Sequence, residues 1–90
     1  MLGQLKIKED DYFVMIDGYT PDQSIIYRLG KYLICHSEAF GCMYHENEES
    51  MKVFVDHWRG TMYRVSKLYA DLHFPDRIMD EEAVENPFYG

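Results

Sequence analysis

The chain has 90 residues, and 47% of its side chains are hydrophobic, which is enough for one small core; we therefore expect a single small domain over residues 1–90. Nine Lys and Arg against sixteen Asp and Glu give a formal net charge of −7. Proteins that bind nucleic acid hold its phosphates with basic side chains, so this charge disfavours direct nucleic-acid binding. No apolar run approaches the ~20 residues of a membrane helix. The first residues also lack the apolar stretch of a secretory signal, and we expect a cytoplasmic protein that does not bind membranes.

An N-terminal β-hairpin is predicted over residues 4–17. Leu5 and Ile7 alternate with lysines, and residues 12–16 combine aromatic and β-branched side chains. Both patterns are typical of strands. The three acids between them, residues 9–11, are expected to form the turn.

A helix is predicted over residues 21–39, with a hairpin as the alternative. The run Thr20-Pro21-Asp22-Gln23 has the hydroxyl, proline, acid and glutamine of a helix N-terminus, and hydrophobic side chains then recur every three or four residues. Gly30 and three β-branched isoleucines favour instead two strands, Ser24–Leu29 and Lys31–His36, that turn at Gly30. We prefer the helix because its start, its period and its end agree.

The most regular pattern in the chain predicts a long helix over residues 50–73. Its hydrophobic side chains are spaced alternately by four and three residues, and they are Met51, Val55, Trp58, Met62, Val65, Tyr69 and Leu72. Acids precede this segment, where the helix dipole favours them, and Phe74-Pro75 ends it. We expect Trp58 and Met62 to lie at the centre of the core.

These elements predict an α+β fold in which the N-terminal β-hairpin packs against two antiparallel helices. If residues 24–36 form a hairpin, the fold is instead an antiparallel β-meander followed by one long helix. An acidic tail over residues 76–90 ends the chain. In it, Asn86-Pro87-Phe88-Tyr89 resembles the NPxY signal read by phosphotyrosine-binding domains and endocytic adaptors.

The residues that could carry metal or thiol chemistry do not form a recognisable site. Cys35, His36, Cys42 and His45 are potential zinc ligands, but the first two are adjacent, so their side chains diverge in either a helix or a strand. The thiols have no cationic neighbour that would activate them. Phosphate-binding loops and nucleophile motifs do not occur in the sequence. We therefore expect no metal, no cofactor, no catalytic residue and no enzymatic activity.

Acidic side chains concentrate in three connecting segments, and we predict that these bind a partner. The predicted residues are Glu9, Asp10 and Asp11 in the first turn, Glu46, Glu48 and Glu49 in the central loop, and Asp80, Glu81 and Glu82 in the tail. A second-choice interface is the polar stripe of the long helix, formed by Lys52, Arg59 and Tyr63. Acidic groups attract a basic partner from a distance and set its rate of association.

The favoured function is therefore a small interaction protein that inhibits or modulates a basic protein partner. A nuclease or another nucleic-acid-binding complex offers such a surface, which the acids would block as a nucleic-acid mimic. Small viral or mobile-element inhibitors of CRISPR or restriction enzymes, which act in the host cytoplasm, are similar in size and charge, and so is a bacterial immunity protein. The sequence also leaves open a structural homo-oligomer or adaptor built on the long helix, including a homodimer, and a small metal or thiol enzyme.

Overall fold

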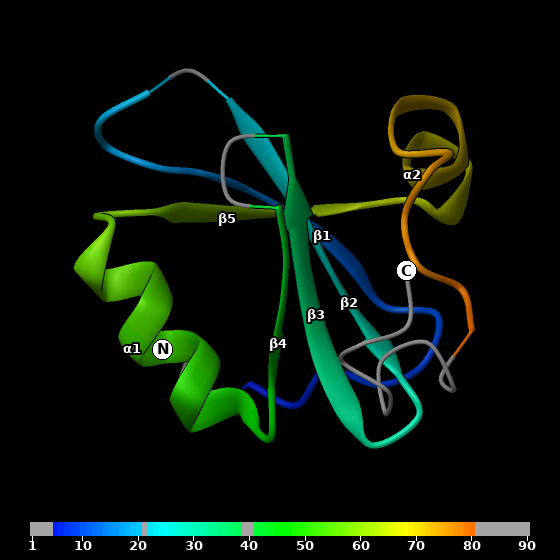
Figure 1. Ribbon diagram of the computed structural model, residues 1–90, viewed down its shortest axis with the longest axis horizontal. Helices are drawn as coiled ribbons and strands as arrows, with labels where there is room; N and C mark the ends of the chain where they lie inside the picture. Colours follow the sequence, from blue (N-terminus) through cyan, green and yellow to red (C-terminus); the bar gives the residue numbers. More distant parts are fainter. Residues whose placement is uncertain (1–4, 21, 39–40, 81–90) are drawn as a thin grey trace.

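The computed structural model describes residues 5–20, 22–38 and 41–80, and they form an α+β fold (Figure 1). A five-stranded antiparallel sheet lies between two helices. In chain order the elements are β1 (Tyr12–Ile16), β2 (Gln23–Leu29), β3 (Tyr32–Ser37), β4 (Gly41–His45), α1 (Glu48–His57), β5 (Thr61–Val65) and α2 (Lys67–His73). No helix within these ranges has the length and apolar character needed to cross a membrane.

The strands have the spatial order β4-β3-β2-β1-β5, so the first four form a meander and β5 returns to the free side of β1. The turn between β2 and β3 passes through Gly30, whose φ of 60° is the left-handed conformation that glycine adopts without strain. β1 pairs with β2 on one side and with β5 on the other. β4 and β5 are the two edges of the sheet.

Both faces of the sheet are covered, which gives two hydrophobic clusters. On one face Phe13 and Met15 of β1 pack with Met51 and other apolar residues of α1. On the opposite face Val14 packs with Ala70 of α2. Neighbouring side chains of a strand point to opposite faces, so the consecutive buried residues of β1 supply both clusters.

The predicted helix over residues 21–39 is wrong, and the hairpin that turns at Gly30 is correct. β2 is buried at four consecutive positions, Ser24 to Tyr27, because a helix covers each face of the sheet. A strand buried on both faces does not alternate polar and apolar residues, so its apolar spacing can imitate that of a helix. Thr20 belongs to a turn, where its backbone N–H and its hydroxyl both donate to Asp17.

The predicted helix over residues 50–73 is also wrong, because its segment forms α1, β5 and α2. α1 ends at His57 with Trp58 as its C-cap, Arg59 has a φ of 52°, and Gly60 follows. A Cβ atom at Gly60 would lie 2.6 Å from Sδ of Met15, so only glycine lets the chain pass this close to β1. The Ser66 side chain then caps α2 by accepting a hydrogen bond from the backbone N–H of Tyr69.

The hydrophobic seam of the predicted long helix is therefore divided. Met51 and Val55 of α1 are buried in the hydrophobic cluster between α1 and the sheet. Trp58 and Met62 are half-buried and pack at the margin of this cluster. Val65 and Tyr69 pack on the opposite face, and Leu72 is 68% exposed. Trp58 and Met62 are therefore not at the centre of the core. The seam also does not form the continuous helical face on which the predicted oligomer was to be built.

The predicted hairpin over residues 4–17 is half correct. Tyr12–Ile16 is a strand, but its partners are β2 and β5, and residues 5–8 form no strand. Asp11 closes the turn, since its carboxylate accepts from the backbone N–H of Lys8 at 3.0 Å. The predicted packing of a hairpin on two antiparallel helices is therefore not confirmed. The structure has instead a five-stranded sheet with one helix on each face. The meander that the sequence left open is present, but the long helix expected after it is broken. Of the tail, residues 76–80 lack regular structure, and the Asn86–Tyr89 motif lies outside the described residues.

Candidate functional site

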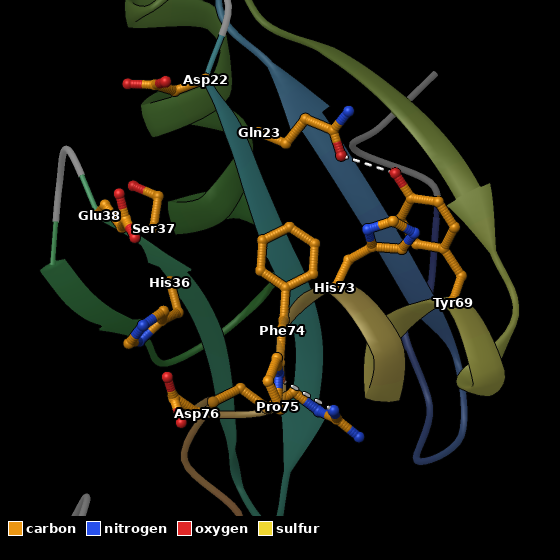
Figure 2. A pocket seen from close by; sticks show the side chains of 11 residues that line it. Asp22, Gln23, His36, Ser37, Glu38, Tyr69, His73, Phe74, Pro75 and Asp76 are labelled. Atoms are coloured by element: carbon orange, nitrogen blue, oxygen red, sulfur yellow. Dashed lines mark hydrogen bonds between the residues drawn. The ribbon is translucent and has the colours of Figure 1, made fainter.

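A pocket with a volume of about 370 Å³ opens on the face of the sheet that α2 covers (Figure 2). It lies where β2 begins and β3 ends, next to the C-terminal end of α2. Its lining residues are Asp22, Gln23, His36, Ser37, Glu38, Tyr69, His73, Phe74, Pro75, Asp76 and Arg77. A volume in this range is typical of sites that bind a small ligand or a side chain of a partner.

The antiparallel pairing of β2 and β3 brings the strand-end residues of the pocket together. Ile25 pairs with His36, which places Gln23 and Glu38 at the same end of the sheet. α2 is fixed to this end, because the hydroxyl of Tyr69 donates to Oε1 of Gln23 at 2.8 Å (Figure 2). The pocket therefore has one wall from the sheet and one from α2.

A third wall is the segment after α2, which Arg77 fastens to the protein. Arg77 is only 5% exposed, its Nη2 donates to Oδ1 of Asp71 at 2.7 Å, and its Nη1 donates to the carbonyl of Phe74 at 3.2 Å. The guanidinium lies over the rings of Tyr12 and Tyr27, with centroid distances of 5.2 and 5.7 Å. The hydrogen bonds from Arg77 and Lys67 hold the pKa of Asp71 below its ordinary value, so the pair stays ionised at neutral pH.

The hydroxyl of Tyr27 adds a second attachment, since it donates to the carbonyl of Ile78 at 2.6 Å. Burial raises the pKa of this phenol above its ordinary value, so it remains a donor throughout the physiological range. The segment that forms the third wall is thus held by Arg77 and by Tyr27, and the pocket is a built feature of the fold.

Three carboxylates make the pocket electronegative. Asp22, Glu38 and Asp76 are exposed, and none of them forms an ion pair with any residue in the described ranges. Among the described residues of the lining, Arg77 has the one guanidinium, and it pairs with Asp71, which also pairs with Lys67 of α2. Among the described lining residues, the charged groups without an ion-pair partner are therefore the three carboxylates.

Aromatic rings and two histidines form the rest of the lining. In Figure 2 the ring of Phe74 stands at the centre of the view, with His36 on one side and Tyr69 and His73 on the other. The Tyr69 and His73 rings pack together at a centroid distance of 4.2 Å. Nδ1 of His36 is buried and has no hydrogen-bond partner among the described residues. The pocket thus combines acidic groups with aromatic faces.

The cysteines lie outside the pocket and are poorly suited to nucleophilic chemistry. Burial raises the pKa of Cys35 to about 12 and also raises that of Cys42, so both are uncharged thiols at neutral pH. Cys42 is the cross-strand partner of His36. Within the described ranges, no three His, Cys, Asp or Glu side chains are grouped so that they could hold a metal ion.

The structure separates the acids that the sequence grouped as one partner-binding set. Glu9, Asp10, Glu46 and Glu49 are exposed at the end of the sheet opposite the pocket, where β1 begins and β4 ends. Asp80 is exposed after the pocket segment, and Glu81 and Glu82 lie outside the described residues.

The predicted acids Glu48 and Asp11 have structural partners among the described residues. Glu48 is 8% exposed and accepts from the backbone N–H of Ile7 at 3.0 Å and from Nη2 of Arg28 at 3.2 Å. Asp11 pairs with Nη1 of Arg64 at 3.1 Å. These contacts hold the N-terminal segment against the sheet, so Glu48 in particular offers no surface for a partner.

The second-choice interface is also dispersed. Lys52 is on α1 and pairs with Asp56, Arg59 is in the turn after α1, and Tyr63 is on β5 with 51% exposure. They share no helical face, because the helix that would have aligned them ends at His57.

Sequence reasoning missed the pocket because its lining comes from the ends of β2 and β3, from α2 and from the segment that follows. The only local signal was the position of Asp22 and Glu38 just outside apolar runs, and that signal requires the strands to be recognised first. Comparisons of the chain with protein-family models, with curated proteins and with solved structures find no match.

Proposed function

We propose that this protein is an interaction module that binds a basic protein partner, and that the pocket between α2 and the sheet anchors a cationic group of that partner. The observation that carries the proposal is that three carboxylates, Asp22, Glu38 and Asp76, line one cavity and form no ion pair with the described residues, while the guanidinium of Arg77 in the same lining is held by Asp71. A cation that enters the cavity gains favourable interactions with these acids.

The distribution of charge gives the two ends of the molecule different roles. The net charge of −7 attracts a basic partner over a distance and mainly raises its rate of association. Four exposed acids at the opposite end of the sheet contribute to this long-range attraction: Glu9, Asp10, Glu46 and Glu49. A concave site with acids in its lining adds short-range interactions, which mainly slow dissociation.

Proteins that handle nucleic acid are the partner class that fits best, because they present clustered Arg and Lys side chains to phosphates. A protein that occupies those side chains competes with the nucleic acid, so we propose inhibition or modulation as the outcome of binding. This function requires no catalytic step from the described residues.

The proposal is tested with two variants that remove the same charge from opposite ends of the molecule. The pocket variant is Asp22→Asn, Glu38→Gln and Asp76→Asn, and the matched control is Glu9→Gln, Asp10→Asn and Glu49→Gln. None of the six side chains forms an ion pair with a described residue, so both variants are expected to fold. Glu48 is left unchanged because it holds the N-terminal segment.

Binding of an arginine-rich peptide is followed by calorimetry and by amide chemical shifts, at low and at high salt. We expect the wild-type protein and the control to bind with shifts around the pocket, and the pocket variant to lose most of the affinity. Equal losses in the two variants would show that net charge alone attracts the peptide. A larger loss in the control than in the pocket variant would instead place the interface around Glu46 and Glu49.

A further inference from the structure

We propose that the pocket selects arginine over lysine, with the guanidinium stacked on the ring of Phe74 and its N–H groups directed to the carboxylates of the rim. This inference rests on the proposed function and names the chemical group that the site receives. It follows from the combination, in one cavity, of an aromatic ring in the lining and acids that form no ion pair with the described residues.

The ring of Phe74 is half-buried and lines the cavity, and it makes no ring–ring or cation–π contact within the described part of the chain. Its position differs from that of the neighbouring rings. Tyr69 and His73 are packed on each other, and Tyr12 and Tyr27 lie under Arg77. Phe74 also packs against the hydrophobic cluster on this face of the sheet, so the part of its ring that lines the cavity is the surface offered to a planar group.

The same fold already holds a guanidinium in the proposed manner. Arg77 lies over two tyrosine rings while its edge donates to the carboxylate of Asp71 and to a backbone carbonyl. On the other face of the sheet, the guanidinium of Arg64 lies 4.7 Å from the centroid of Phe13 and donates to Asp11. In both cases one arginine uses an aromatic face and an acid together, and the pocket offers these two partners to an arginine from outside.

The chemistry of the two basic side chains explains the selectivity. A guanidinium is planar and weakly hydrated, so it can stack on a ring with its face while its edge donates several hydrogen bonds in the plane. An ammonium is a compact, strongly hydrated charge that gains less from the ring. Both are attracted by Asp22, Glu38 and Asp76, so the acids alone would not separate them.

The test uses two peptides of equal length and charge, an amidated Gly-Arg-Gly-Arg-Gly and its lysine counterpart, titrated into the whole protein. We expect the arginine peptide to bind about two- to fivefold more tightly, the range expected from one exposed cation–π contact. Its arginine side-chain protons should also shift upfield, because they lie over an aromatic ring. In Phe74→Leu both peptides should bind with nearly equal affinity.

Each result decides a different statement. Equal affinities for the two peptides in the wild-type protein, or a preference for arginine without upfield shifts, would overturn the arginine inference and leave the proposed function intact. The proposed function itself would be overturned if neither peptide binds the wild-type protein. It would also be overturned if the variant at Asp22, Glu38 and Asp76 binds with full affinity. If Phe74→Leu does not fold, the wild-type comparison and the ring-current shifts still decide the question.

Discussion

Replacing Glu48 by Ala should destabilise the protein far more than the same change at Glu49, one residue along the helix. Glu48 is 8% exposed and its carboxylate accepts from the backbone of Ile7 and from Arg28. A hydrogen bond to a charged group contributes about 1.5–3 kcal/mol, and a buried N–H left without a partner costs about 1–3 kcal/mol. Because these contributions overlap, we expect a loss of roughly 3 kcal/mol for Glu48→Ala.

The loss is large relative to the stability of a domain of this size. Small domains unfold with about 5–15 kcal/mol, and 1 kcal/mol shifts the Tm of such a chain by about 4–8 °C. Glu48→Ala should therefore lower the Tm by roughly 12–24 °C. Glu49 is exposed and interacts mainly with the helix dipole, so Glu49→Ala should cost less than about 1 kcal/mol.

The pH dependence provides an independent check of the same contact. Burial alone would raise the pKa of Glu48, but the hydrogen bond from Ile7 and the charge of Arg28 outweigh it and hold this pKa below its ordinary value of 4.5. A depressed carboxyl pKa stabilises the fold above the unfolded value, and this stability is lost as pH falls through the folded pKa. Glu48→Gln should therefore be less stable at neutral pH and lose less stability on acidification below about pH 4.5.

Urea unfolding followed by circular dichroism measures both variants against wild type. Equal unfolding midpoints for Glu48→Ala and Glu49→Ala would refute the structural role of Glu48. The acid would then belong with the exposed partner-binding residues, as the sequence had suggested.

Three further predictions test other parts of the fold. Burial lowers the pKa of His45 below 6.5, so stability should fall as pH drops through that ordinary value, and His45→Gln should flatten this part of the profile measured by urea unfolding. Gly60→Ala should cost about 1–3 kcal/mol by thermal unfolding, because the new methyl group meets the fully buried Met15; an unchanged Tm would contradict the close approach at this turn. Asp17 accepts three hydrogen bonds from the turn that follows β1, so Asp17→Ala should lower the urea midpoint more than Asp22→Ala, whose carboxylate accepts no such bonds from the described residues. Equal midpoints for these two variants would show that the turn does not need Asp17.

The sequence by itself determined the α+β class, the strand at Tyr12–Ile16, the turn at Gly30 as the second choice for its segment, and the acidic character of the surface. These features depend on local chemistry: β-branched and aromatic residues favour strands, glycine accepts a positive φ, and charge is a property of composition.

The tertiary structure decided the rest, because the same local spacing of apolar residues serves more than one element. β2 and β3 are buried on both faces, which removes the alternation that identifies a strand. The regular spacing from Met51 to Leu72 is divided by the turn at Gly60, since the chain must pass close to Met15 there and return to the edge of the sheet.

The functional site shows the same limit. Glu48 and Glu49 are adjacent acids that the sequence does not distinguish. In the structure Ile7 and Arg28 donate hydrogen bonds to Glu48, whereas Glu49 is exposed. Asp22, Glu38 and Asp76 line one pocket because two antiparallel strands end together and because Arg77 fastens the segment after α2 beside them. Long-range strand pairing and packing bring these residues into one pocket. The spacing of residues along the chain does not reveal that pairing directly.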